Sequence, residues 1–413
     1  MARTFAFKRI APVLFGFFVM GFVDVVGIAT SYVKHDFALS DTLAGLLPAS
    51  VFLWFALFSI PSGILMCRAG RRNTVALSLF VTAAAMLIPL FLYRFLSVLF
   101  AFALLGIGNT VLQVSLNPMA ASAVHPARTA GVLALGQFVK AISSFLGPVI
   151  AGTAAAFLGN WKLIFPVYAA VSLLSVLWLL LAVPVREERE EAGATFASAF
   201  SLCRDRMMRR LFAGILCIVG MDVGLNTFIP KLLMDKTGIP LSEAGLGASL
   251  YFAARTAGSL AGAVLVAGYA AGRFLKWSMA AAIVAFVLLL IADTPLLLYA
   301  MIIVVGLMCA NVFPLIFSVA LRRQPERTGE ISALMIAGVS GGALVTPFMG
   351  AVSDAYGPVA GFSVLLICLI YLLALSFGLS STDGTIHHAD QSGTKWNRSD
   401  PCGGSDRHKM EPE

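Results

Sequence analysis

The sequence predicts an all-α membrane protein in which twelve helices cross the bilayer as two bundles of six. Of its 413 residues, 59% are hydrophobic and 12% are charged, and the mean hydropathy is +0.90. Soluble domains have about 45–50% apolar and about 25% charged residues. The apolar runs approach the roughly 20 residues that a helix needs to cross a bilayer, whereas barrel strands would give alternating segments of about ten.

The apolar runs form two sets of six on either side of a polar stretch. They lie at 10–33, 43–66, 74–92, 96–122, 130–157 and 163–183, and then at 211–233, 243–267, 277–292, 296–320, 330–352 and 359–380. We therefore expect an N-terminal bundle over 1–183, a cytoplasmic linker over 184–210 and a C-terminal bundle over 211–380. The segment 381–413 has almost no apolar residues, so we expect a disordered polar tail.

The distribution of basic residues predicts the orientation. Most of the 29 lysines and arginines lie before the first span, in the loops on that same side, in the linker and in the tail. Basic residues favour the cytoplasmic side of a membrane, so both termini are expected in the cytoplasm. The same rule accounts for the net charge of +8 without nucleic-acid binding. We expect a multi-pass protein of a bacterial-type inner membrane, in contact with lipid and sufficient as a monomer.

The two halves resemble each other near their first spans. The segment GFVDVVG at 21–27 corresponds to GMDVGLN at 220–226, which places Asp24 opposite Asp222. Further on, LLPASVF at 46–52 corresponds to GLGASLY at 245–251. Transporters built from such repeats place their substrate site between the repeats, near the middle of the membrane.

The loop between the second and third spans carries a recognisable motif. The segment GILMCRAGRR at 63–72 resembles the signature loop of the major facilitator superfamily, with Cys67 where the family usually has Asp. In that family the loop takes part in gating, and its Asp helps to latch the two halves, so the resemblance implies a transporter that lacks this acid. The matching residues are Gly63, Leu65, Arg68, Gly70, Arg71 and Arg72.

Shorter motifs resemble those of the fucose:proton symporter family of sugar transporters. They include LNP at 116–118, VGMDV at 219–223, NVFPLIFS at 311–318 and GVSGGALVTPFMGAVSD at 338–354. The resemblance implies a proton-coupled sugar transporter. Three positions depart from the family: its first-span Asp falls on Gly27 here, its fourth-span Glu on Gln113, and a fifth-span Asn on Lys140. The chain has lost one family acid and gained a base, which makes fucose a doubtful substrate.

Four charged residues lie within spans, where each costs about 2.5–3.5 kcal/mol and usually marks an ion or substrate pathway. We expect Asp24 to pair with Lys140 and Asp222 to pair with Arg255. Asp24 is our candidate for the site of proton or cation coupling, with Lys140 as its internal counter-ion. Alternatively, Lys140 binds a substrate carboxylate, or both pairs only hold their bundles together.

Neutral amides and aromatic rings suit sugar hydroxyls, although amides also bridge membrane helices. The remaining substrate-binding candidates are Gln113, Asn117, Gln137, Asn226, Tyr251 and Asn311, together with Asp222 and Arg255.

These observations favour a secondary transporter that takes up a hexose or sugar derivative with protons by alternating access. The alternative is an exporter or antiporter of drugs or organic anions on the same fold, and a lesser one is a membrane sensor without transport. The sequence shows no phosphate-binding loop, no nucleophile and base at a plausible spacing, and no His or Cys at metal-ligand spacing. We therefore expect no enzymatic activity, cofactor or metal.

Overall fold

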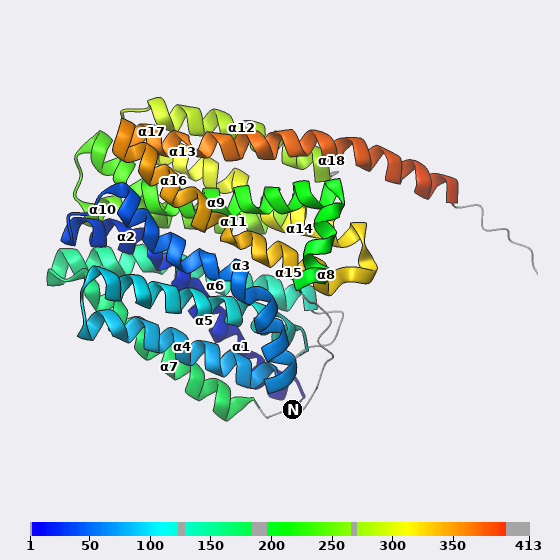
Figure 1. Ribbon diagram of the computed structural model, residues 1–413, viewed down its shortest axis with the longest axis horizontal. Helices are drawn as coiled ribbons and strands as arrows, with labels where there is room; N and C mark the ends of the chain where they lie inside the picture. Colours follow the sequence, from blue (N-terminus) through cyan, green and yellow to red (C-terminus); the bar gives the residue numbers. More distant parts are fainter. Residues whose placement is uncertain (1, 123–128, 184–195, 266–270, 394–413) are drawn as a thin grey trace, which may run out of the picture.

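The computed structural model describes residues 2–122, 129–183, 196–265 and 271–393, and these form helices without any strand (Figure 1). The N-terminal half consists of α1 (Ala2–Met20), η1 (Gly21–Asp24), α2 (Val25–Asp36), α3 (Asp41–Ala69), α4 (Arg71–Phe91), α5 (Phe95–Ser122), α6 (Thr129–Leu158), η3 (Trp161–Leu163) and α7 (Ile164–Ala182).

The C-terminal half begins after the linker. It consists of α8 (Phe196–Ser201), η4 (Leu202–Arg204), α9 (Arg206–Thr237), α10 (Leu241–Ala244), α11 (Leu246–Leu265), α12 (Ala271–Ile291), α13 (Pro295–Cys309), α14 (Val312–Arg323), η6 (Pro325–Arg327), α15 (Thr328–Ala337), η7 (Gly338–Ser340), α16 (Gly341–Tyr356), α17 (Pro358–Ser363) and α18 (Leu365–Gly393).

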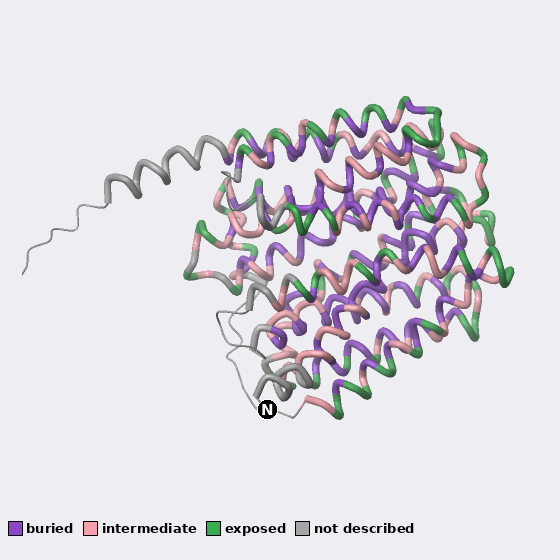
Figure 2. The backbone as a smooth tube through the Cα atoms, turned by 180° about the vertical axis from the view of Figure 1, so that it is seen from behind, coloured by how far each residue is buried: buried purple, intermediate pink, exposed green. Residues whose placement is uncertain are grey.

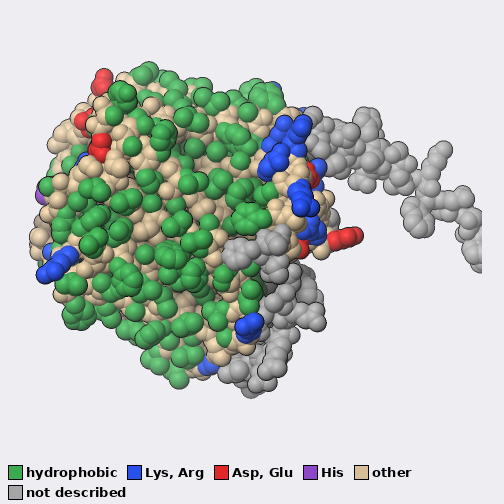
Figure 3. Space-filling view, in the orientation of Figure 1, with side chains coloured by type: hydrophobic (Ala, Val, Ile, Leu, Met, Phe, Trp, Pro, Cys, Tyr) green, Lys and Arg blue, Asp and Glu red, His purple; other side chains and the backbone are tan. Residues whose placement is uncertain are grey.

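The predicted all-α membrane fold is confirmed. Eleven helical stretches in the described residues are long and apolar enough to cross a membrane, and α11 corresponds to the predicted eighth span. Large apolar side chains cover the middle of the surface, while Lys and Arg gather at its ends (Figure 3). The buried residues face inward between the helices (Figure 2). An apolar belt of this kind is suited to lipid, because lipid tails cannot hydrogen-bond to polar groups.

The helix α18 differs from the predicted polar tail. It continues past the last apolar residues to Gly393, whereas we expected disorder from residue 381. Extending an existing helix costs much less than starting a new one, which accounts for its continuation beyond the apolar run. The rest of the predicted tail, 394–413, and most of the predicted linker, 184–195, lie outside the described residues.

The described end of the linker is anchored to the C-terminal half. Asp205 caps α9 by accepting a hydrogen bond from the backbone of Met207 at 2.8 Å, and it forms an ion pair with Arg323 of α14 at 2.6 Å. The hydrogen bond from Arg323 lowers the pKa of Asp205 below its usual value, because it favours the ionised form. These contacts fix where the second half begins.

Three spans are broken near their middle. The first span contains η1 between α1 and α2, the tenth is interrupted between α13 and α14, and the eleventh contains η7 between α15 and α16. Breaks inside a membrane free backbone groups that neighbouring helices must satisfy. The first break carries Asp24, the principal charged candidate from the sequence.

Candidate functional site

Asp24 lies at the end of η1, where the first span packs against α6. The approach is close, since a Cβ on Gly21 would lie 2.5 Å from the carbonyl oxygen of Lys140. The Ser144 hydroxyl donates to Asp24 Oδ2 at 2.5 Å and lies 3.1 Å from the Lys140 carbonyl oxygen. The carboxylate of the first span is therefore held against α6 by a serine.

The side chain of Lys140 is placed differently from our expectation. It precedes Ser144 by one helical turn on the same face of α6, and it is half-buried. Within the described residues, no ion pair or hydrogen bond of its ammonium is found. The expected pair of Asp24 and Lys140 is thus absent from this conformation, because Ser144 occupies the position beside the carboxylate and the lysine lies one turn further along.

Asn226 of α9 connects the C-terminal half to the broken first span at Asp24. Its Nδ2 donates to the backbone carbonyl of Asp24 at 2.7 Å, which satisfies a carbonyl beside the break. A Cβ on Gly27 would lie 2.2 Å from Asn226 Cγ. This contact leaves no room for a side chain at position 27, because the amide of the opposite half fills the space.

Replacing Gly27 with valine is expected to reduce transport by about tenfold or more. The added side chain overlaps Asn226 and prevents the halves from meeting at this level, and overpacking costs typically 1–3 kcal/mol. Initial uptake rates in proteoliposomes measure the effect. The double variant Gly27→Val with Asn226→Ala should recover part of the rate. Equal rates for Gly27→Val and the unaltered protein would show that this contact does not form during transport.

Asp222 and Arg255 form a second charged group within the C-terminal half. Arg255 Nη2 lies 2.6 Å from Asp222 Oδ2, and the side chains are 29% and 10% exposed. Tyr251 donates its hydroxyl to Asp222 Oδ1. The structure therefore brings together the pair expected from the sequence and adds Tyr251, a third substrate-binding candidate, through its hydroxyl.

The side-chain amides of the fourth span form some of their hydrogen bonds within the N-terminal half. Asn109 donates to the carbonyl of Met20 at 2.8 Å, which satisfies a group freed by the break of the first span. Gln113 donates to Asn109 Oδ1 at 2.9 Å, and Asn117 donates to the carbonyl of Gln113 at 3.0 Å. Asn109 therefore stabilises the break, while Gln113 and Asn117 retain acceptor oxygens.

The other two amide candidates have different environments. Asn311 lies at the break between α13 and α14, and it donates to the carbonyl of Gly258 on α11 at 2.8 Å. This bond connects the break to α11, and it leaves the Asn311 side-chain oxygen available as an acceptor. Gln137 lies on α6 and is exposed, without a hydrogen bond to any described residue. Neither amide therefore makes a hydrogen bond to Asp24, Ser144 or Asn226 in the part of the chain that the structure describes.

The signature loop is a tight turn in the N-terminal half. The helix α3 ends at Ala69 and α4 begins directly after Gly70, which has φ +80°. Arg72 donates to the carbonyl of Leu180 at the end of α7 at 2.6 Å. The loop thus lies against its own half, and the side chain of Cys67 lies outside the description. The remaining motif residues Gly63, Arg68 and Arg71 lie on the helices flanking the turn.

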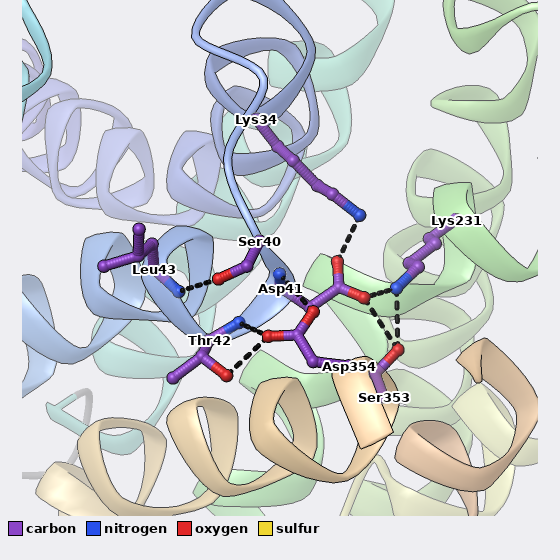
Figure 4. Close-up of polar contacts among 8 residues, drawn as sticks. All are labelled: Lys34, Ser40, Asp41, Thr42, Leu43, Lys231, Ser353 and Asp354. Atoms are coloured by element: carbon purple, nitrogen blue, oxygen red, sulfur yellow. Dashed lines mark hydrogen bonds and ion pairs between the residues drawn. The ribbon is translucent and has the colours of Figure 1, made fainter. Parts of the chain in front are cut away.

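A second polar cluster, which the sequence did not predict, lies opposite the N-terminus and the end of α18 (Figure 1), and Figure 4 shows its residues. Asp41 at the start of α3 forms ion pairs with Lys34 of α2 and Lys231 of α9. Ser353 of α16 donates to Asp41 Oδ2 at 2.8 Å and accepts from Lys231 at 2.7 Å. Side chains of both halves therefore converge on one carboxylate.

Asp354 adds a second connection between the halves. It accepts hydrogen bonds from the backbone of Asp41 at 2.7 Å and of Thr42 at 2.8 Å, and from the Thr42 hydroxyl at 2.6 Å. The first turn of a helix has unpaired N–H groups and favours a negative charge, which is why this carboxylate binds there. We call the whole group the end latch: Lys34, Asp41, Thr42, Lys231, Ser353 and Asp354.

Replacing Asp354 with alanine should loosen the end latch. The change removes three hydrogen bonds, and their partial exposure limits the loss to about 1 kcal/mol or about fivefold in the population of open molecules. A cysteine in place of buried Thr346, in a background without native cysteines, would react correspondingly faster with a maleimide. Asp293→Ala is the matched control, since Asp293 is exposed and pairs with Lys236 of its own half. Equal labelling in both variants would contradict the latch.

Comparison with known proteins identifies the fold family. The family model described as Major Facilitator Superfamily matches residues 13–338. The chain belongs to the major facilitator superfamily. This membership makes it a multi-pass membrane transporter and not an enzyme.

Individual members of the superfamily are similar over most of the chain. A glucose/galactose transporter of Brucella abortus is 28% identical over 378 residues, covering 86% of this chain and 90% of that protein. A mutant form of the nucleoside transporter NupG has a TM-score of 0.75 at 16% identity, covering 91% and 99%. A mutant form of the Escherichia coli fucose:proton symporter FucP has a TM-score of 0.65 at 18% identity, covering 90% and 98%. The two structures support the superfamily fold that the motifs had indicated.

Proposed function

We propose that this protein takes up a hexose or a sugar derivative together with protons by alternating access. The proposal places it in a bacterial-type inner membrane, with both termini in the cytoplasm. Similarity to a glucose/galactose transporter and to a fucose:proton symporter supports the substrate class and the coupling ion. The single observation that carries the mechanism is the position of Asp24, which both halves contact at the broken first span.

Protonation of Asp24 is the proposed coupling step. The ionised carboxylate accepts a hydrogen bond from Ser144, whereas its protonated form gains an O–H donor that can bind a substrate hydroxyl. The contact of Asn226 with the Asp24 backbone must break when the halves rock apart. Changes at this one residue would therefore link proton binding to the movement of the halves.

In this orientation the end latch faces the outside and is the proposed outer gate. It connects α3 of the first half with α9 and α16 of the second, so outward opening requires the contacts of Asp41 and Thr42 with those two helices to separate. Charged groups that pair only when a gate is closed stabilise one conformation over the other. The structure would then represent a state that is closed toward the outside.

Uptake into proteoliposomes tests the function. A panel of labelled neutral hexoses and sugar acids is offered with an inward proton gradient and without one. Accumulation of at least one sugar above its outside concentration, only with the gradient, is the expected result. Uptake that ignores the gradient would overturn proton coupling, and the absence of sugar uptake would overturn the substrate class.

Transport of an organic anion is a second candidate, and it is favoured by Lys140. This half-buried ammonium lies on α6, one turn before Ser144, without a partner among the described side chains, and a positive charge within a span favours an anionic ligand. If only acidic compounds move in the same assay, Lys140 becomes the substrate anchor. Lys140→Gln should then abolish their uptake, with Lys162→Gln as the control at the end of the molecule.

A further inference from the structure

A cavity of about 400 Å³ adjoins the end latch, between α2, α3 and α9. Both halves therefore line it. Its volume falls in the range of roughly 300–1,000 Å³ that small-molecule sites occupy. It is separate from the group around Asp24, since none of the side chains that contact that carboxylate lines it. The charged and titratable residues of its wall are Lys34, His35, Asp41 and Lys231.

The two lysines of this cavity keep donors to spare. An ammonium has three N–H donors. In the described contacts, Lys34 donates one N–H to Asp41. Lys231 donates one N–H to Asp41 and a second to Ser353. Their side chains are 33% and 21% exposed, whereas Asp41 is only 8% exposed. Both ammonium groups can therefore donate hydrogen bonds to a ligand without movement of the backbone.

The cavity wall carries more positive than negative charge. Its one carboxylate, Asp41, serves both lysines. The nearby Asp354 does not line the cavity, and both of its oxygens bind the first turn of α3. Two ammonium groups thus share one carboxylate in this wall, and the carboxylate of an anionic ligand can compete with Asp41 for them.

The remaining wall suits hydroxyl groups. Thr30 and Thr227 donate their protons to carbonyls of their own helices at 2.6 and 2.8 Å, so their oxygens remain acceptors toward the cavity. Ser31 and the ring of Phe228 also line it, and Lys231 lies 5.6 Å from the centre of that ring. Hydroxyl acceptors beside a ring and two cations fit a small polyol that carries one carboxylate.

We propose that this cavity is an outer binding site for a sugar acid, whose carboxylate replaces Asp41 as the partner of Lys34 and Lys231. Binding exchanges the two ion pairs of Asp41 for pairs with the ligand, and it frees the contact of Asp41 with Lys231 that joins the halves, so the ligand itself loosens the end latch. A neutral sugar lacks the group that competes with Asp41. The assignment as the outer side rests on the proposed function, whereas the binding site does not.

Equilibrium binding to the purified full chain tests the proposal. Calorimetry compares D-glucuronate, acetate and D-glucose, and every protein carries Lys140→Gln so that the central cation does not contribute. We expect glucuronate to bind about tenfold more tightly than acetate and glucose. Lys34→Gln and Lys231→Gln should each weaken glucuronate binding about tenfold, the size of one charge-assisted contact. The matched control is Lys162→Gln, since Lys162 lies over the ring of Tyr93 at the same end.

The variant Asp41→Asn separates a binding site from a purely structural latch. It removes the competing carboxylate and keeps both lysines, so glucuronate should bind several-fold more tightly, opposite in sign to Lys34→Gln. Weaker or unchanged binding in Asp41→Asn would overturn the proposal, and equal binding of acetate and glucuronate would overturn its sugar part. If sugar uptake is driven by protons but Lys34→Gln does not change glucuronate binding, this site is rejected and the proposed function stands.

Discussion

Replacing Asp24 with asparagine is expected to abolish proton-driven accumulation, so that the substrate concentration inside proteoliposomes only equals that outside. Asparagine has the same shape and still accepts the hydrogen bond from Ser144, but it has no proton to take up or release. Exchange of labelled for unlabelled substrate should therefore continue in part, because exchange needs no net proton movement. The measurement is the steady-state accumulation ratio with an inward proton gradient, beside the exchange rate at equal concentrations.

Two controls separate coupling from damage to the fold. Ser144→Ala keeps the carboxylate and removes only its hydrogen-bond donor, so accumulation should fall but persist. Asp293→Asn changes an exposed acid at the end of the molecule and should have no effect. Unchanged accumulation in Asp24→Asn would refute Asp24 as the coupling site, and loss of both accumulation and exchange would give it a role in substrate binding instead.

The sequence predicts the charged residues of the interior well, because charge in an apolar span is rare and costly. It thereby indicates Asp24, Asp222 and Arg255, and the structure places the latter two in contact. Pairing within one half depends on neighbouring spans, whose arrangement follows from the repeat. The helical membrane fold is predictable for the same reason, since long apolar runs depend on local composition alone.

The partner of Asp24 illustrates what the sequence cannot predict. Ser144 is a small neutral residue, and nothing in the sequence distinguishes it from the other serines of the spans. The rotation of α6 relative to η1 places Ser144 beside the carboxylate of Asp24, whereas Lys140 lies one turn earlier. A single turn of register is invisible in hydropathy. The position of Gly27 is equally unpredictable, because the side chain that fills its space comes from Asn226 in the other half.

The end latch escapes prediction for a related reason. Lys34, Asp41 and Lys231 each lie at a span end, where charged residues are ordinary. Their contact depends on how the two halves meet, and the bonds of Asp354 to α3 join residues far apart in the chain. One signal was present, since the motif at 338–354 ends in Ser353 and Asp354, but it names no partner.

Replacing Arg255 with methionine is expected to destabilise the protein by about 3 kcal/mol. The change leaves Asp222, which is 10% exposed, with the hydroxyl of Tyr251 as its one remaining partner among the described side chains. Breaking a buried ion pair costs about 3–5 kcal/mol because one charge remains unpaired, and the 29% exposure of Arg255 favours the lower end. The midpoint of thermal unfolding in detergent measures the loss.

The double variant Asp222→Asn with Arg255→Gln decides what the pair does. It removes both charges and keeps polar side chains of similar shape, so no uncompensated charge remains and most of the stability should return.

Transport by this double variant then distinguishes two roles of the pair. If the pair only holds the C-terminal half together, uptake returns with stability. If Asp222 and Arg255 contact the substrate, uptake stays at least about tenfold below that of the unaltered protein, because the charge-assisted bonds to the substrate are gone. We expect the second result, since the exposed part of Arg255 remains available to a ligand, and full recovery of uptake would refute it.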